Sequence, residues 1–276
     1  MSEFLPGMLG VFDSGLGGLT IAKAIRQRLP EYQLAYLGDT ARLPYGNRSA
    51  DLVYRFTTEA VGYLLSQGCP LVVVACNTAS ALALRRLQRE WLPVHFPDRR
   101  VLGVIRPISE YVADASRGGR VGVVGTASTV GSGAFVREIS GRNPRISVVQ
   151  QACPLLVPFI EEGWGRRPET AKLVRDYVRP LQEAQVDTLV LGCTHYPMLR
   201  AEFAAAMGEH CFIPDPAAVV AEKLADYLAR HPERELQISR GANHRYLVTE
   251  HTDRFAQLAG EWLGHPLTLE GVDLQP

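Results

Sequence analysis

Two cysteines stand at matching points of the chain, each at the end of an apolar run that predicts a buried strand. Cys76 ends the run LVVVAC and Cys193 ends the run TLVLGC, and small polar residues follow each before a predicted helix. The positive end of a helix dipole and its free amides lower the pKa of a thiol from about 8.5, which raises the thiolate fraction. The repeated pattern predicts two thiols that exchange protons with a bound molecule.

For either cysteine alone, a buried structural sulfur is the simpler interpretation, since free cysteine is among the most buried residue types. Two cysteines in matching contexts instead favour a role in proton transfer for both. Cys69, Cys153 and Cys211 lack that context and are expected to be structural. The five cysteines contain no C-x-x-C pair, so neither a disulfide framework nor a zinc knuckle is expected.

The residues beside the two thiols carry hydrogen-bond donors suited to a carboxylate. Asn77 and Thr78 follow the first cysteine, and Thr194 and His195 follow the second. His195 also raises the question of a metal, but no second spaced Cys/His pair completes four zinc ligands. No metal or cofactor is expected.

Asp13 also follows an apolar strand and precedes Ser14. It could orient a substrate amine or assist a nearby base; a plain helix N-cap is the alternative. The run Gly15–Gly18 lacks the G-x-G-x-x-G spacing and the Gly-Lys-Ser/Thr end of nucleotide loops, so no nucleotide is expected. Its glycines would let backbone amides approach a small carboxylate.

Two further loops are candidates. Tyr45 and Gly46 lie in a loop that also contains Gly38-Asp39-Thr40 and is either a turn or a substrate loop with one aromatic hydroxyl. Glu161 and Glu162 follow an apolar stretch; a solvated helix face is the ordinary interpretation, and their nearness to the loop 154–163 allows a site role.

The elements that position these residues alternate between short β-branched runs and helical periodicity, which is typical of βαβ units and parallel sheets. The fold class is therefore predicted to be α/β. Strands are expected at 8–12, 33–37, 71–75, 101–104, 121–124, 146–150, 188–191 and 211–213, and helices near 18–29, 49–67 and 79–91.

The strand series restarts near Arg120, and the two cysteine junctions echo one another, as GVFDSGLGG more loosely does VGVVGTAST. We therefore expect two similar lobes. The first would comprise residues 1–116 and roughly 214–276, and the second residues 117–213.

Composition excludes several classes of protein. The 276 residues are 46% hydrophobic and 21% charged, as in ordinary globular proteins, and 29 basic residues balance 29 acidic ones. Zero net charge makes nucleic-acid binding unexpected. The longest apolar run is about six residues, where a membrane span needs about 18, and the N-terminus lacks a basic signal-peptide region. A soluble cytoplasmic protein is expected.

Five motifs in order resemble the cofactor-independent aspartate/glutamate racemase superfamily and, within it, the glutamate racemases: GVFDSGLGGLT, YLGDTARLPYG, VVVACNTAS, ACPLLVPFIEEG and LVLGCTHYPML. The resemblance implies two pseudo-symmetric α/β lobes with the active site in the cleft between them. It also implies interconversion of L- and D-glutamate, which supplies D-glutamate for peptidoglycan in cell-wall synthesis and cell shape, by a homodimer.

The resemblance also assigns roles by position. Cys76 and Cys193 become the proton-transfer residues on opposite faces of the substrate, Asp13 assists Cys76, and Glu161 and His195 assist Cys193. The implied substrate contacts are Asp13, Ser14, Tyr45, Gly46, Asn77, Thr78, Thr126, Thr194 and His195.

One residue departs from the family pattern. Arg106 in GVIRPISE stands where relatives commonly have glutamate, which bears on assembly and regulation more than on chemistry. Only a short segment precedes the first motif, so strict activation by a nucleotide precursor is not expected.

Alternative functions are an aspartate racemase or a decarboxylase or isomerase of the same superfamily. Another is a silent binding protein, such as one that restrains DNA gyrase.

Overall fold

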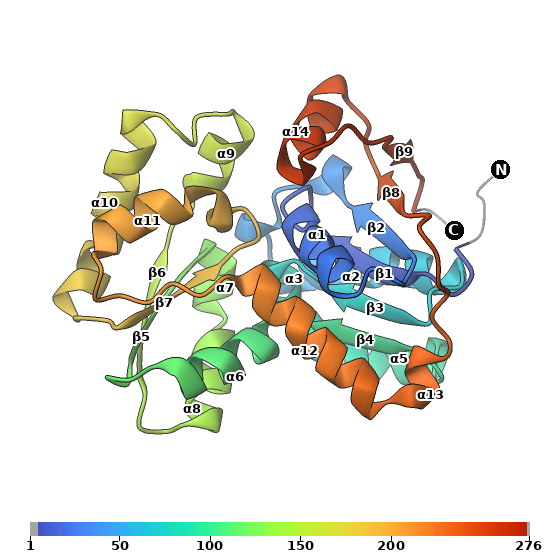
Figure 1. Ribbon diagram of the computed structural model, residues 1–276, viewed down its shortest axis with the longest axis horizontal. Helices are drawn as coiled ribbons and strands as arrows, with labels where there is room; N and C mark the ends of the chain where they lie inside the picture. Colours follow the sequence, from blue (N-terminus) through green and yellow to red (C-terminus); the bar gives the residue numbers. More distant parts are fainter. Residues whose placement is uncertain (1–4, 275–276) are drawn as a thin grey trace.

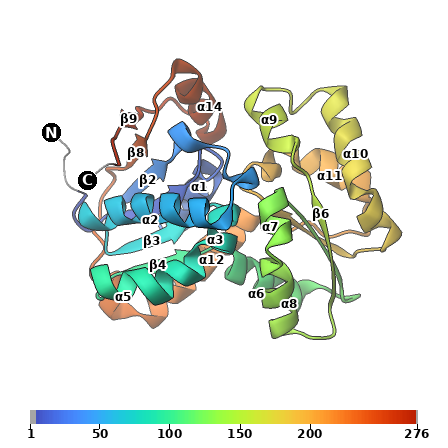
Figure 2. The same cartoon turned by 180° about the vertical axis from the view of Figure 1, so that it is seen from behind.

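The strands of the protein form two separate sheets in which all pairings are parallel. The computed structural model describes residues 5–274 and is shown from opposite sides in Figures 1 and 2. A six-stranded sheet has the order β4-β3-β1-β2-β8-β9 and a three-stranded sheet the order β6-β5-β7. This arrangement confirms the predicted α/β class with helices flanking parallel sheets. The strands are β1 (Leu9–Asp13), β2 (Leu34–Gly38), β3 (Leu71–Val74), β4 (Arg100–Gly103), β5 (Arg120–Gly125), β6 (Ser147–Ala152), β7 (Thr188–Gly192), β8 (Arg245–Val248) and β9 (Glu270–Gly271).

The large sheet is buried on both faces because its strands carry apolar residues in consecutive positions. Leu9 and Val11 of β1 pack into a cluster with one layer of helices, while Phe12 packs into a second cluster on the other face. The first layer is formed by α1 (Leu19–Arg28), α12 (Pro216–Arg230) and α14 (Asp253–Leu263). The second contains α2 (Ala50–Ser66), α3 (Asn77–Leu82), α4 (Leu84–Arg86), the π-helical turn η3 (Leu87–Trp91) and α5 (Leu92–His95).

The small sheet is also covered on both faces. Val121 and Val123 of β5 pack with α6 (Ile105–Ala115) and α8 (Ala134–Arg142), while Val124 faces the other layer. That other layer contains α9 (Leu156–Glu161), α10 (Pro168–Glu183), the 3₁₀ turn η4 (Tyr196–Leu199) and α11 (Arg200–Met207). In the described part of the chain, no helix is long and apolar enough to cross a bilayer.

The remaining elements are short. They are the 3₁₀ turns η1 (Thr40–Arg42) and η2 (Tyr45–Asn47), and helices α7 (Ala127–Gly131) and α13 (Pro232–Glu235).

Two predicted elements are wrong. Residues 211–213 form no strand; Phe212 makes only an isolated bridge to Thr188, at the edge of the small sheet. The single helix predicted at 79–91 is broken into α3, α4 and η3. Pro93 contributes to the widened turn that precedes it, since proline has no N–H for the carbonyl of Arg89 and its ring crowds that carbonyl.

The last part of the chain returns to the large sheet, where β8 pairs with β2 and β9 with β8. Helix α12 packs beside α1 on the way. The strands before residue 116 and after residue 214 therefore lie in the large sheet and those between lie in the small one, whereas the exact lobe boundaries stay a prediction.

Candidate active site

The carboxyl ends of strands from both sheets border one small cavity of about 70 Å³. Cys76 follows β3 of the large sheet and Cys193 follows β7 of the small one, and both line this cavity. Parallel strands direct the loops after them to one edge of a sheet, which is where ligands bind in such folds. The other predicted site residues in the lining are Ser14, Tyr45, Gly46, Asn77, Thr78, Thr126, Glu161, Thr194 and His195.

The Cys76 thiol lies at the start of α3 and is buried. It donates to the Ser14 hydroxyl over 3.3 Å and accepts from the amide of Ala79 over 3.4 Å. Burial and the nearby charge of Asp13 nevertheless raise the pKa of Cys76 to about 12, and these two hydrogen bonds only partly offset the increase. The expectation that the helix start lowers this pKa is wrong, because desolvation of a thiolate outweighs one short helix end.

Asp13 is not part of the cavity lining and is fully buried. One carboxylate oxygen accepts from the amide of Gly15 at 3.1 Å, and the other accepts from the Thr194 hydroxyl at 3.3 Å. Burial raises the pKa of Asp13, although the charge of His195 and these hydrogen bonds act in the opposite direction. Asp13 thus links the loop after β1 to the loop after β7.

Cys193 is followed by a tight turn rather than directly by an α-helix, since η4 separates it from α11. Its sulfur lies 3.9 Å from His195 Nδ1, and His195 Nε2 lies 3.0 Å from a carboxylate oxygen of Glu161. Burial lowers the pKa of His195, but the hydrogen bonds to Cys193 and Glu161 outweigh it and raise the pKa to about 10. A positively charged imidazole therefore stands beside the second thiol at neutral pH.

Three threonine hydroxyls join the two halves of the site. Thr78 of α3 lies 3.0 Å from Thr126 and 3.2 Å from Thr129, which belong to the start of α7. Thr126 also contacts Gly46, where an added Cβ would come within 2.8 Å of the threonine methyl carbon. This contact closes one wall of the cavity, so Gly46 is needed there for its small size.

The Tyr45 hydroxyl is already occupied, because it donates to the buried carboxylate of Asp39. Burial and the Asp39 charge raise the pKa of Tyr45 far above its usual range. Asp39 also accepts from Arg42 at 2.7 Å and from Thr249 at 2.9 Å. The Tyr45 hydroxyl is therefore bonded within the protein rather than free for a bound molecule, and Asp39, interpreted from the sequence only as part of a turn, holds the loop.

Asn77 carries an amide oxygen that is buried and lacks a hydrogen-bond partner among the described residues. Asn77 lines the cavity. Buried polar groups in proteins are nearly always hydrogen-bonded, so this oxygen is suited to a donor on a bound molecule such as an ammonium group.

The glycine run after β1 also has a packing role, beside the approach of its amides to a carboxylate, which stays a prediction. The amide of Gly15 is used by Asp13. A Cβ on Gly17 would come within 2.5 Å of the Thr194 hydroxyl and 2.6 Å of His195 Nδ1. The glycines therefore let the loops from the two sheets approach each other closely.

Two residues noted in the sequence lie outside the cavity lining. Glu162 is exposed and pairs with Arg254 at 3.4 Å, and Arg106 is exposed and pairs with Glu110 at 2.9 Å. Gly15 of the glycine run also lines the cavity. The other lining residues are apolar apart from one amide, and no reactive side chain could have identified them in the sequence: Leu43, Pro44, Asn47, Pro154, Val157 and Pro158. Among residues 5–274, no cluster of three or more metal-ligating side chains is found.

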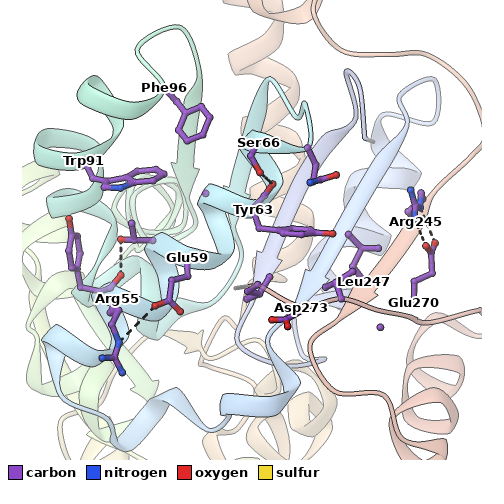
Figure 3. Close-up of a pocket in the computed structure, with 17 residues that line it drawn as sticks. Arg55, Glu59, Tyr63, Ser66, Trp91, Phe96, Arg245, Leu247, Glu270 and Asp273 are labelled. Carbon is purple, nitrogen blue, oxygen red and sulfur yellow. Dashed lines mark hydrogen bonds and ion pairs between the residues drawn. The ribbon is translucent and has the colours of Figure 1, made fainter. Parts of the chain in front are cut away.

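A larger groove of about 970 Å³ runs over α2 toward β8 and β9 (Figure 3). Trp91 and Phe96 line one side of it, and Leu247 lies on the other. No cysteine or histidine of the described residues lines this groove. Arg55, one of its charged residues, lies 4.0 Å from the carboxylate of Glu59 and is already in an ion pair. Size alone does not make it the reaction site, which we place at the smaller cavity with the thiols.

Comparison with known proteins gives one consistent answer. Residues 19–224 match the family model described as Asp/Glu/Hydantoin racemase. A curated glutamate racemase of Geobacter metallireducens is 42% identical over 259 residues, which covers 94% of this chain and 93% of that protein.

Solved structures agree. A glutamate racemase isoform from Bacillus anthracis superposes with a TM-score of 0.89 at 33% identity, covering 97% of this chain and 98% of that one. The Francisella tularensis glutamate racemase in complex with D-glutamate gives a TM-score of 0.86 at 30% identity, covering 97% of each chain.

Proposed function

This chain belongs to the Asp/Glu/hydantoin racemase family, and from that premise we propose that it interconverts L- and D-glutamate without a cofactor. The observation that carries the proposal is the meeting of Cys76 and Cys193, from different sheets, at one cavity. Inverting a carbon centre requires a base on one face and an acid on the other. Two thiols from opposite halves of the molecule meet that requirement.

In the proposed reaction, the thiolate of one cysteine takes the α-proton of glutamate, and the electron pair of the broken C–H bond remains on the substrate. The opposite thiol then donates its proton to the other face and becomes the thiolate. No proton is gained or lost over the cycle. The reverse direction uses the same two groups with their roles exchanged.

The two thiols are supported by different neighbours. With a pKa of about 12, Cys76 rests as the thiol, and we assign to Asp13 the role of assisting it. Cys193 lies beside His195, whose pKa of about 10 keeps the imidazole protonated, with Glu161 behind it. We therefore propose a resting enzyme that is asymmetric, with the positive charge on the Cys193 side.

The α-proton of glutamate is weakly acidic, so the cavity must stabilise negative charge that develops next to the carboxylate. We assign this work to the donors around the two thiols, which are Ser14, Asn77, Thr78, Thr126 and Thr194. Preorganised donors act most strongly where water is excluded, which suits a buried cavity of about 70 Å³. Tyr45 and Gly46 line the same cavity, with Gly46 next to Thr126.

The choice of glutamate rests on the curated and solved relatives. These are glutamate racemases, and this chain matches them over nearly their whole length. From the same likeness we propose that the product D-glutamate serves peptidoglycan synthesis, and that the protein acts in the cytoplasm as a homodimer.

A substrate panel tests the proposal. Purified protein is incubated with each enantiomer of glutamate and aspartate, with EDTA and without added cofactor, and circular dichroism follows the loss of optical activity. We expect both glutamate enantiomers to converge on a racemic mixture and aspartate to change much more slowly. Racemisation of aspartate alone would indicate the aspartate racemase alternative. An absence of any change with all four substrates would contradict the proposal.

A further inference from the structure

The helix α14 of the large-sheet half lies beside α9 of the small-sheet half, close to the thiol site (Figures 1 and 2). Two side chains of α14 contact His195 and Glu161, the pair of residues beside Cys193. These contacts are not explained by packing of α14 on its own sheet.

The first contact joins Trp262 and His195. Their rings meet at 86°, nearly perpendicular, with centroids 5.5 Å apart, which is a favourable edge-to-face arrangement. Gly17 limits the imidazole from another direction, since a Cβ there would come within 2.6 Å of Nδ1. The ring is thus confined between α14 and the loop after β1 while its two nitrogens face Cys193 and Glu161.

The second contact joins Arg254 to the end of α9. Its guanidinium donates to the backbone carbonyl of Glu161 and lies 3.4 Å from the carboxylate of Glu162. The bond to the main chain fixes where α9 ends, and therefore where the Glu161 side chain begins.

Helix α14 is itself anchored to the large sheet. Lys23 of α1 donates to the carbonyl of Trp262 over 3.3 Å. The Trp262 side chain packs against hydrophobic clusters of both halves, one containing residues of β1 and α1 and the other residues of β7 and α9. The position of the His195 ring, in the small-sheet half, therefore depends through Trp262 on the position of the large-sheet half.

We propose that Trp262 and Arg254 are positioning residues that hold the His195–Glu161 pair in line with Cys193, so that α14 governs proton transfer at Cys193 and not at Cys76. This inference rests on the proposed racemase function and deepens it. The geometry makes the dependence steep, because the Cys193–His195 distance of 3.9 Å is already long and a small rotation of the ring would break it.

The test compares Trp262→Leu with the conservative Trp262→Phe, which keeps an aromatic edge, and with Trp91→Leu as a control tryptophan in the distant groove. Arg254→Ala is matched with Arg179→Ala, another arginine in an exposed ion pair. We expect kcat/KM to fall about tenfold in Trp262→Leu and severalfold in Arg254→Ala, and to stay within about twofold in Trp262→Phe and both controls.

The decisive readout is the isotope effect on kcat/KM with glutamate deuterated at the α-carbon, measured for each enantiomer. Slower transfer at Cys193 raises the effect for the enantiomer that Cys193 deprotonates and lowers it for the other. Exchange catalysed by Cys76→Ser identifies which enantiomer that is. A general loss of packing would move both isotope effects together.

The outcomes separate the two proposals. If the unaltered protein does not racemise glutamate, the proposed function fails. If it does, and Trp262→Leu keeps normal kinetics, or loses activity with both isotope effects shifting in the same direction, the positioning role of α14 is overturned. Thermal unfolding of each variant is recorded so that rates are compared only between folded proteins.

Discussion

Asp13 and Thr194 are joined by a 3.3 Å hydrogen bond, although Asp13 ends a strand of the large sheet and Thr194 follows a strand of the small one. The buried Asp13 carboxylate raises the pKa of Cys76, and the same carboxylate feels the charge of His195, the neighbour of Cys193. The electrostatics of the two thiols are therefore coupled through one aspartate. A change of charge at Asp13 itself is therefore expected to act on both sides of the cavity.

Replacing either thiol should abolish racemisation and leave a half-reaction. We expect Cys76→Ser and Cys193→Ser each to lower kcat at least about 100-fold, because a positioned proton-transfer group contributes about 10²–10⁴-fold. Each variant keeps one thiol, so in D₂O each should exchange the α-proton of one enantiomer only, and the two variants should prefer opposite enantiomers. Proton NMR measures the exchange, with Cys211→Ser as the matched control. Full racemase activity in either active-site variant would refute the paired thiols.

Asp13→Asn should lower the pKa of Cys76. Burial is the largest cause of its value near 12, and the Asp13 charge is the next, so removing that charge favours the thiolate. Thiolate absorbance at 240 nm, corrected with the same protein carrying Cys76→Ser, should be larger at pH 9 in Asp13→Asn than in the unaltered protein. Racemase activity should nevertheless fall, because Asp13 assists Cys76 in the proposed reaction. Asp176→Asn, an exposed carboxylate, should change neither quantity.

Glu161→Gln should bring the pKa of His195 down from about 10, since the hydrogen bond and charge of Glu161 contribute to raising it. His195 has a higher pKa in the folded protein than its unfolded value of about 6.5, so its protonation stabilises the fold fully below about pH 6.5. This stabilisation is lost as the pH rises through about 10. The free energy of unfolding should therefore drop by about 1 kcal/mol at pH 6 and hardly at all at pH 10.5. NMR titration of labelled histidine gives the pKa directly, and an unchanged value would contradict the ion pair.

The basic limb of the pH–rate profile offers a second measurement on the same variant. If the protonated imidazole assists Cys193, the limb should move to lower pH in Glu161→Gln. Glu183→Gln is the matched control, because Glu183 is an exposed glutamate of α10 outside the cavity lining.

The sequence predicted the elements best where the pattern was local. Apolar runs ending in polar residues located β1, β3 and β7, and the helix predicted near 49–67 matches α2, which Ser49 caps. A strand at 211–213 was also predicted, and it failed because only Phe212 bonds to the edge strand β7 before the chain enters α12 at Pro216.

The candidate site divided in the same way. Residues directly after strands, such as Cys76 and Thr194, could be predicted to gather because parallel strands end at a common edge. The partnership of Asp39 with Tyr45 could not, since a Gly-Asp-Thr loop is equally a turn. Trp262 carries no motif, and its contact with His195 exists only because the end of the chain returns to the large sheet and then reaches across.

Gly17→Ala tests whether close approach of the two loops is required for catalysis. Gly17 does not have a positive φ, so alanine strains no backbone angle, and the cost comes from a Cβ placed 2.5 Å from the Thr194 hydroxyl and 2.6 Å from His195 Nδ1. Overpacking of this kind costs about 1–3 kcal/mol. The Cβ would displace the imidazole beside Cys193 and the Thr194 hydroxyl that donates to Asp13. We therefore expect kcat/KM to fall about 100-fold while the protein remains folded.

The control is Gly141→Ala, at a helical position with open space within 4 Å, where alanine should stabilise the helix by about 0.5–1 kcal/mol and leave activity unchanged. Steady-state kinetics and thermal unfolding of both variants check the pair. Should Gly17→Ala racemise glutamate as fast as Gly141→Ala, the position of the His195 ring would not limit the reaction, and the asymmetric resting state built on that ring would have to be abandoned.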